Sequence, residues 1–384
     1  MKKFLWFLLL LTCAVSLVSC GVDSNNKTPS TDNGDTTNTT AGSIGLAYTV
    51  NSNGKTCTIT GIGTCTDTEI DIPNKIDDYK VTDIGERAFA DCITITSIQI
   101  PNTVKSIGSR AFYGCTGITE IAIPESVSNI GTQVFYKASN LHTVYYNSSF
   151  SSQNNPILDL NHITKVIFNG NQIPAYILQG ATNITDVIIG DKVKDIGGYA
   201  FDGCASLSGI VISDSVTSIS WSAFKDCTSL TSIVIPDSVT NVAWSVFEGC
   251  ISLTSVTIGN GLTSIGDRMF YECTALTNVT IGNRVTSIGS YAFNNCTSLT
   301  SIVIPDSVTT IEDWAFYKCS SLTNVSIPDS VRVIDYAAFV ACSSLTTIEF
   351  EGTIEQWNSI SKMSTWNENT GSYIVYCDDG TISK

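Results

Sequence analysis

Cysteine and histidine are the side chains of this sequence that could ligate a metal, form disulfides or supply a nucleophile and its base. The sequence holds 14 cysteines but only 2 histidines. Most of the cysteines recur at one fixed spacing, so neighbours could form disulfides, hold metal ions or be buried thiols. Alanine or leucine takes the same place at Ala138, Leu160 and Ala181, which favours buried thiols because the place accepts apolar groups without sulfur. The recurring cysteines are Cys92, Cys115, Cys204, Cys227, Cys250, Cys273, Cys296, Cys319 and Cys342.

Groups that could catalyse a reaction are sparse. His142 and His162 fall in the least regular part of the sequence, and no serine or cysteine stands beside a base at a recognisable spacing. The two histidines could approach each other across adjacent repeats, but we interpret them as surface or packing residues. A recurring Asp or Asn, such as Asp237 and Asn260, could offer oxygens to calcium, although its place in a turn accounts for it without an ion. We therefore expect no catalysis, no metal and no cofactor.

Cys57 and Cys65 lie outside the recurring column. They bound the segment TCTITGIGTC, which could fold as a hairpin whose ends are joined by a disulfide. Two free thiols are the alternative. Cys377 has no evident partner.

Cys20 is the one cysteine whose surroundings indicate a covalent modification. The segment MKKFLWFLLLLTCAVSLVSC has two lysines, an apolar run and a small-residue end, which indicates an export signal rather than a membrane span. Its ending, Leu-Val-Ser-Cys, is similar to a bacterial lipobox, in which cleavage leaves the cysteine to be acylated. An ordinary signal peptide with a chance cysteine is the alternative. We predict a signal peptide over residues 1–19, then a lipidated Cys20 and a polar, disordered tether over 20–44.

The segments that carry the recurring cysteines are copies of a 23-residue repeat. Residues 229–240 and 298–309 both read SLTSIVIPDSVT, and their separation of 69 residues is three times 23. A fixed period of this size predicts stacked units rather than a closed globule. A phenylalanine three residues before the cysteine marks most copies, and two degenerate copies with Ile157 and Leu178 at that place complete the series. We count twelve repeats over residues 83–350.

Each repeat predicts one coil of a solenoid. Leu230, Ile233 and Ile235 match the L-x-x-I-x-I strand of leucine-rich repeats, with those side chains pointing inward, and Pro-Asp then ends the strand. A second short extended piece follows, and the Phe and Cys are spaced for one face of a single helical or 3₁₀ turn. Burying the apolar side chains of one coil contributes roughly 10 to 20 kcal/mol, whereas ordering its backbone and side chains costs roughly 35 kcal/mol. A coil is therefore stable only when stacked.

The repeat, S-L-T-S-I-x-I-P-D-S-V-T-x-I-G-x-x-A-F-x-x-C, closely resembles that of BspA-like leucine-rich repeat bacterial surface proteins, and the likeness covers residues 45–384. The resemblance implies a β-rich solenoid with one short helical or 3₁₀ turn per coil, capped at both ends. The implied N-terminal cap spans residues 45–82. The implied C-terminal cap spans 351–384, where Trp357, Ile360 and Trp366 would cover the last coil. The short coils at 140–181 depart from the regular pattern.

The resemblance implies a function, and the net charge argues against some classes of partner. The family suggests a non-enzymatic cell-surface protein, some members of which act as adhesins toward host matrix proteins or other bacteria. A carbohydrate-recognition module for glycan capture and an architectural surface spacer are the alternatives. The net charge of −15 argues against nucleic acid and against anionic lipid as partners of the folded part. We expect a monomer at the outer membrane or cell surface, bound to the membrane through its lipid anchor only, with extracellular proteins or glycans as partners.

Two surfaces carry side chains that the repeat does not require. On the strand side, β-branched residues form an apolar strip, although simple strand propensity also favours such residues. On the side of the predicted helical turn, residues two or three before the Phe should face outward, and many of them are aromatic. Stacking between neighbouring coils is the alternative there, as for Trp221 on Trp244 or Trp314 on Tyr317. The strip is Ile167, Ile188, Val211 and Val234, and the aromatic stripe is Tyr199, Trp221, Trp244, Tyr291, Trp314 and Tyr336.

Overall fold

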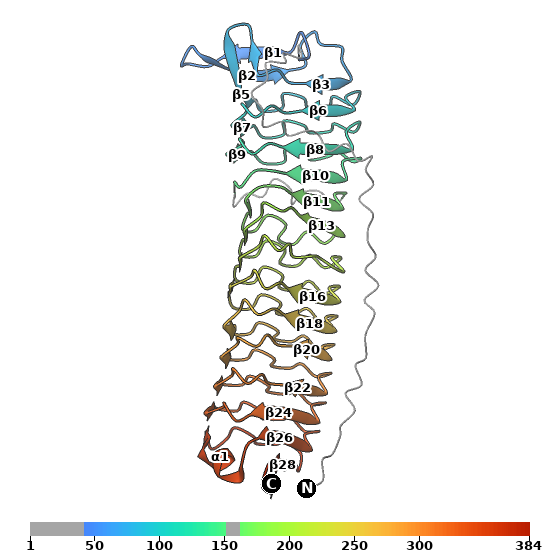
Figure 1. Ribbon diagram of the computed structural model, residues 1–384. Coiled ribbons are helices and arrows are strands. Elements are labelled where there is room, and N and C mark those ends of the chain that lie inside the picture. Colours follow the sequence, from blue (N-terminus) through green and yellow to red (C-terminus); the bar gives the residue numbers. More distant parts are fainter. Residues whose placement is uncertain (1–41, 151–161) are drawn as a thin grey trace, which may run out of the picture. The chain divides into compact units, whose positions relative to one another are not determined.

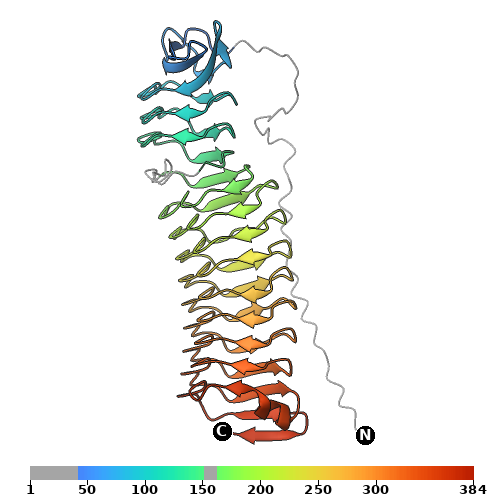
Figure 2. The same ribbon diagram turned by 90° about the vertical axis from the view of Figure 1, so that its left-hand side faces the viewer.

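The computed structural model describes residues 42–150 and 162–384. The described chain is a β-solenoid of about 13 turns with nearly no helix, which confirms the predicted fold class (Figure 1). Seen from the side, the coils stack on one another along a single axis (Figure 2). The predictions for Cys20, Ile157 and Leu160 lie outside the described residues.

In all but the coil of Val211, one strand of each described coil lies on a first side of the solenoid with parallel pairing, which we call the strand face. Its strands pair at equivalent places of successive repeats, for example Ser232 with Ser255 and Val234 with Thr257. The alternation of buried and exposed residues along β16 matches the predicted inward Ile233 and Ile235. The strands are β3 (Glu69–Asp71), β6 (Ser97–Gln99), β8 (Glu120–Ile123), β10 (Thr143–Tyr146), β11 (Lys165–Phe168), β13 (Asp186–Ile189), β16 (Ser232–Ile235), β18 (Ser255–Ile258), β20 (Asn278–Thr280), β22 (Ser301–Val303), β24 (Asn324–Pro328), β26 (Thr347–Glu351) and β28 (Ile374–Cys377).

The second extended piece of each coil forms a shorter parallel ladder. Most of its strands have two residues, the second of which is buried in most coils, as predicted from the spacing of the valines and isoleucines. They are β5 (Tyr79–Ile84), β7 (Ser106–Ile107), β9 (Asn129–Ile130), β12 (Gln172–Ile173), β14 (Asp195–Ile196), β15 (Ser218–Ile219), β17 (Asn241–Val242), β19 (Ser264–Ile265), β21 (Ser287–Ile288), β23 (Thr310–Ile311), β25 (Val333–Ile334) and β27 (Ser361–Lys362).

The remaining elements lie at the two ends of the solenoid. At the N-terminal end, β1 (Ala47–Val50) and β2 (Thr56–Gly61) form an antiparallel hairpin, and β4 (Lys75–Ile76) pairs with β5. At the C-terminal end, α1 (Ile354–Ser359) precedes β29 (Gly380–Ser383), which pairs antiparallel with β28. No helix in the described ranges is long and apolar enough to cross a membrane.

A column of phenylalanines fills the core. Phe224, Phe247 and Phe270 are each fully buried, with ring centroids 5.4 and 5.6 Å apart and nearly parallel rings. The same stacking recurs along most of the array, and Leu178 is buried at the equivalent place. The prediction that these side chains face inward is confirmed.

The segment around each phenylalanine differs from the predicted helical or 3₁₀ turn. It consists of consecutive turns in which the residues two before and two after the Phe have positive φ, as at Ser245 (57°) and Gly249 (73°). Backbone N–H groups alternate in direction: that of Phe247 donates to Met269 O in the next coil, whereas that of Cys250 donates to Phe247 O. In a helical turn, all of the N–H groups would donate within the coil. Here the alternating direction lets every second N–H group donate to the next coil and link the two coils.

The recurring cysteines are free thiols, and from Cys115 onward they are buried. Their Sγ atoms also bond between coils: Cys227 donates to Phe201 O and Cys250 to Phe224 O, each at 3.2 Å. Burial raises the pKa of Cys204 to about 12 and that of Cys227 well above its ordinary value, so both stay protonated at neutral pH. The thiol interpretation is confirmed, and the weak S–H donor explains why cysteine suits a place that alanine also fits.

Cys57 and Cys65 are free thiols, so the candidate disulfide is not formed. The segment between them is not a hairpin, because residues 56–61 are all one strand, β2. Cys57 pairs with Val50 and Gly61 with Ala47, so Cys65 follows the far end of that strand. Four residues of strand span about 13 Å, which is beyond the reach of a disulfide.

Candidate functional site

The predicted apolar strip lies on the strand face, where three of its four side chains are well exposed. Ile188, Val211 and Val234 expose 42%, 82% and 59% of their surface, whereas Ile167 is only partly exposed. Val211 belongs to an extended segment between β13 and β16 that pairs with neither strand in the described structure. The strip is therefore an exposed apolar surface, and the ion pair between Lys165 and Asp186 lies beside it on β11 and β13.

The aromatic stripe lies on a second surface of the solenoid, which we call the turn face. This face consists of the residues from three before to two after each core Phe. Trp221, Trp244 and Tyr336, each three before the Phe, expose 42%, 53% and 42% of their surface. Those two before the Phe are half-buried, namely Tyr199, Tyr291 and Trp314.

The expectation that the residue two before the Phe faces outward is wrong for Ser222 and Ser245. They expose only 1% and 2% of their surface. Their positive φ, 52° and 57°, turns the chain back at this point. Side chains at this place therefore lie against the neighbouring coil instead of pointing to solvent.

The aromatic contacts within the stripe also differ from the stacking alternatives. Trp314 stacks on Tyr291 at 4.9 Å between centroids and meets Tyr336 edge-on at 4.9 Å, rather than lying on Tyr317. Trp221 lies over Gly198, where a Cβ would be 2.7 Å from the indole. The C-terminal half of the stripe is thus one aromatic cluster, whereas Trp221 and Trp244 are held separately.

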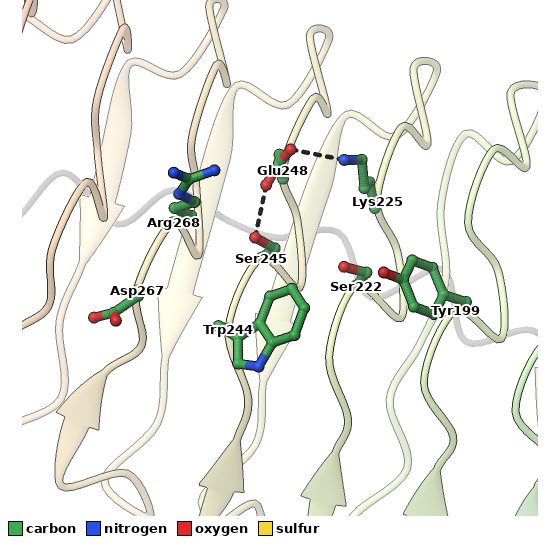
Figure 3. Close-up of a pocket in the computed structure, with 8 residues that line it drawn as sticks. All are labelled: Tyr199, Ser222, Lys225, Trp244, Ser245, Glu248, Asp267 and Arg268. Atoms are coloured by element: carbon green, nitrogen blue, oxygen red, sulfur yellow. Dashed lines mark hydrogen bonds and ion pairs between the residues drawn. The ribbon is translucent and has the colours of Figure 1, made fainter.

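A concavity of about 310 Å³ lies on the turn face around Trp244 (Figure 3). Ser222 and Ser245 lie in it as buried small side chains, and the aromatic rings of Tyr199 and Trp244 border it. Successive coils contribute to it, so it exists only in the stacked array. Its lining residues are Tyr199, Ser222, Lys225, Trp244, Ser245, Glu248, Asp267 and Arg268.

Glu248 organises the charged side of this concavity. Its carboxylate accepts from Lys225 Nζ at 2.7 Å and from Ser245 Oγ at 2.6 Å. Partial burial raises the pKa of Glu248, but the hydrogen bonds from Lys225 and Ser245 outweigh that effect and leave the pKa lowered. The hydrogen bond to Glu248 raises the pKa of Lys225. Both groups are therefore charged at neutral pH, and Glu248 is a poor base for activating Ser245.

Arg268 and Asp267 close the concavity from the next coil. The Arg268 guanidinium carbon lies 5.1 Å from the ring centroid of Tyr291 and 5.6 Å from that of Tyr271. These cation–π contacts orient the guanidinium, which forms no ion pair within the part of the chain that the structure describes. Asp267 Oδ1 accepts from the Ser290 N–H at 3.0 Å.

A second concavity of about 310 Å³ lies further along the turn face. It includes Tyr291 and Trp314 of the predicted stripe, together with Lys318, whose Nζ is 5.2 Å from the Tyr317 ring centroid. Four of the six stripe residues thus line the two concavities, and the other two, Trp221 and Tyr336, are exposed on the same face. Its lining residues are Tyr271, Glu272, Tyr291, Asn294, Asn295, Trp314, Tyr317 and Lys318.

The histidines do not form a site. The backbone oxygen of His142 accepts from the N–H groups of Thr164 and Lys165 in the next coil. His142 therefore lies opposite those two residues and not opposite His162. Burial lowers the pKa of His162. Over residues 42–150 and 162–384, no group of His, Cys, Asp and Glu is arranged to hold a metal ion. The recurring Asp and Asn serve the turns, since Asp237 Oδ1 accepts from the Asn260 N–H at 2.6 Å.

Comparison with known proteins identifies the repeat. The family model described as "BspA type Leucine rich repeat region (6 copies)" matches residues 63–173, 171–296 and 263–369. A leucine-rich repeat protein from Bacteroides ovatus has 26% sequence identity and a TM-score of 0.55, with 84% of this chain and 97% of that chain covered. A leucine rich cell surface protein from Faecalibacterium prausnitzii has 29% identity and a TM-score of 0.41, with 83% and 96% covered. No curated protein matches the chain. The matched residues span most of the repeats, and the chain therefore belongs to the BspA-type leucine-rich repeat family.

Proposed function

We propose that this chain is a non-enzymatic, adhesin-like protein that binds an extracellular or host matrix protein through its turn face. The observation that carries the proposal is the exposure of Trp221 and Trp244 beside a concavity that also holds Arg268. Tryptophan, tyrosine and arginine are the residues that dominate protein interfaces, because each covers a large area with few rotatable bonds. The repeat needs none of them there, since its core is complete without them.

The family supports this role in general terms. Proteins with BspA-type repeats are bacterial surface proteins, and leucine-rich repeat folds commonly mediate protein–protein binding. Families built on this scaffold are typically non-enzymatic. The net charge of −15 further favours a protein or glycan ligand over a nucleic acid.

An architectural spacer is the less favoured alternative. A spacer would gain nothing from exposed tryptophans, which cost solubility when they have no partner. Glycan capture is favoured over the spacer by the polar side chains around Trp244, and it leads to a more specific inference below.

For the chain as a whole we propose a signal peptide over 1–19, a lipidated Cys20 and tether over 20–44, an N-terminal cap over 45–82, twelve repeats over 83–350 and a C-terminal cap over 351–384. The burial of Trp357 and Trp366 supports the last of these. Trp366 packs edge-on against Phe339, the last phenylalanine of the core column, at 6.0 Å. Such contacts would cover the apolar surface that a bare terminal coil exposes.

The anchor is tested by Cys20→Ala. We expect the variant to appear in the soluble fraction or to accumulate unprocessed, because the acceptor of the acyl chains is gone. Fractionation of expressing cells, followed by alkaline and high-salt washing, measures this, with Cys13→Ala as the control that leaves the lipobox intact. A Cys20→Ala protein that stays in the washed membranes would contradict lipid attachment.

The binding surface is tested by changing Trp221, Trp244 and Trp314 together to serine. We expect cells that display the variant to lose at least about tenfold in retention on films of extracellular matrix proteins, since interface tryptophans are each worth about 2 kcal/mol or more. Circular dichroism should show an unchanged fold, because the side chains lie outside the core.

A matched triple variant on the strand face, Ile188, Val211 and Val234 to serine, serves as the control and should retain full adhesion. If this variant loses adhesion and the tryptophan variant does not, the binding surface is the strand face. If neither variant changes adhesion, the adhesin role of both faces is excluded.

A further inference from the structure

We propose that the concavity around Trp244 is a saccharide-binding subsite that holds one neutral hexopyranose unit of a glycan. The inference rests on the proposed function, since it assigns a ligand class to part of the same turn face. A hexopyranose has one apolar C–H face and a rim of hydroxyl groups that both donate and accept. The concavity offers the complement of each of these features.

Ser222 supplies the first argument, because its hydroxyl is left without a partner. The residue is 1% exposed and lines the concavity, yet its Oγ forms no hydrogen bond in the part of the chain that the structure describes. Ser245, its equivalent one coil later, donates to Glu248 at 2.6 Å. The residue after the Phe is Lys225 in the coil of Ser222, so no carboxylate is available to it there. A ligand hydroxyl that enters the concavity can donate to the Ser222 hydroxyl or accept from it.

The aromatic side chains supply the second argument. Trp244 is 53% exposed although it is fixed to a rigid coil, and Tyr199 borders the same concavity. An indole face is electron-rich and attracts the polarised C–H groups on the apolar face of a sugar ring. Figure 3 shows the Trp244 ring on one side of Ser245, and Glu248, Lys225 and Arg268 on the other.

The balance of charge supplies the third argument and decides against an acidic ligand. Lys225 and Arg268 contribute two positive charges, and Glu248 and Asp267 contribute two negative charges. An anionic sugar would meet both carboxylates in a protein with a net charge of −15. A neutral hydroxylated ring can instead donate to the carboxylates and accept from the Arg268 guanidinium, whose donors are held in place by Tyr271 and Tyr291.

The size of the concavity limits the ligand to a single ring. Its volume of about 310 Å³ is at the lower end of the range for small-molecule sites. The free energy per atom that is typical of small ligands then gives a molecule of this size a dissociation constant in the millimolar range. Useful retention of a cell would therefore come from several rings of one glycan or from many copies of the protein.

The test is titration of the purified full chain with glucose, galactose, mannose and N-acetylglucosamine, followed by saturation-transfer NMR and calorimetry. We expect millimolar binding of at least one of them. Trp244→Ala should weaken it about tenfold or more, and Ser222→Ala about fivefold, through loss of one hydrogen bond. Tyr136→Ala, which removes an exposed aromatic side chain that lines neither concavity, is the matched control and should leave the affinity unchanged.

The inference is overturned if no neutral hexose binds, if Tyr136→Ala weakens binding as much as Trp244→Ala, or if glucuronate binds more tightly than glucose. It is also overturned if short aromatic peptides displace the sugar at lower concentration, since the site would then recognise protein. If the unchanged chain binds a sugar but cells that display it do not adhere to protein films, only the proposed protein-binding role is contradicted. Sugar binding that is absent while adhesion persists would contradict only the subsite.

Discussion

Raising the pH from about 8.5 toward 12 should unfold the solenoid. Burial raises the pKa of Cys204 to about 12, and it raises the pKa values of Cys227, Cys250 and Cys273 well above the ordinary value. Because the folded-state pKa is higher than the unfolded-state value of about 8.5, the unfolded chain loses its thiol protons first. The contribution of these thiols to stability is therefore complete below about pH 8.5 and declines as the pH rises toward the folded-state values.

The size of this effect comes from the number of equivalent thiols. Each costs about 1.4 kcal/mol of stability per pH unit above its unfolded-state pKa. Four consecutive thiols therefore cost about 5.6 kcal/mol for each pH unit, which is comparable with the whole stability of a small domain. Far-UV circular dichroism of the reduced protein against pH measures the transition.

The matched variant for the pH experiment changes Cys227, Cys250 and Cys273 to alanine. Alanine occupies the same place at Ala138 and Ala181, where it is buried or half-buried, so the array should still fold at neutral pH. Its alkaline transition should move to higher pH, because fewer thiols lose protons on unfolding. A transition that stays at the same pH in this variant would show that other groups cause the unfolding.

Phe247→Ala should destabilise the middle of the array by about 3 to 5 kcal/mol, the usual cost of truncating a buried aromatic side chain. The ring is fully buried and lies between Phe224 and Phe270 at 5.4 and 5.6 Å, so its loss removes contacts on both sides. Neighbouring coils cannot close the gap, because strand pairing on two sides holds their spacing. Urea unfolding followed by tryptophan fluorescence and circular dichroism measures the loss.

Ser245→Ala is the comparison for Phe247→Ala. The sequence alone predicts a change under about 0.5 kcal/mol for a surface serine. The structure instead predicts about 1 kcal/mol, because Ser245 is buried and donates to Glu248 at 2.6 Å. Equal losses for the two variants would contradict the assignment of Phe247 to the core.

Much of the fold could be predicted from the period and the apolar pattern. The 23-residue spacing, the L-x-x-I-x-I strand and the Phe column each appear in the structure at the predicted places, as Ile233, Ile235 and Phe247 show. This works because each coil has the same neighbours, so one local hydrophobic pattern determines which side chains face inward in every copy.

The backbone around the phenylalanine was not predictable in the same way. The spacing of Val246, Phe247 and Cys250 suits one face of a helical turn, yet it suits equally the consecutive turns that the structure contains. The choice depends on hydrogen bonds between coils, such as Phe247 N–H to Met269 O and Cys250 Sγ to Phe224 O. Periodicity within a single repeat carries no information about such partners.

The sequence by itself therefore determined the solenoid, its buried columns and the aromatic character of the turn face, because these follow from the order of side chains within each repeat. The tertiary structure decided which of those side chains meet. Ser222, Trp244, Glu248 and Arg268 come from three successive coils and surround one concavity only because stacking brings residues about 23 positions apart into contact. Stacking also pairs Lys225 with Glu248 of the next coil at 2.7 Å, whereas the hydrogen bond from Ser245 to Glu248 lies within one coil.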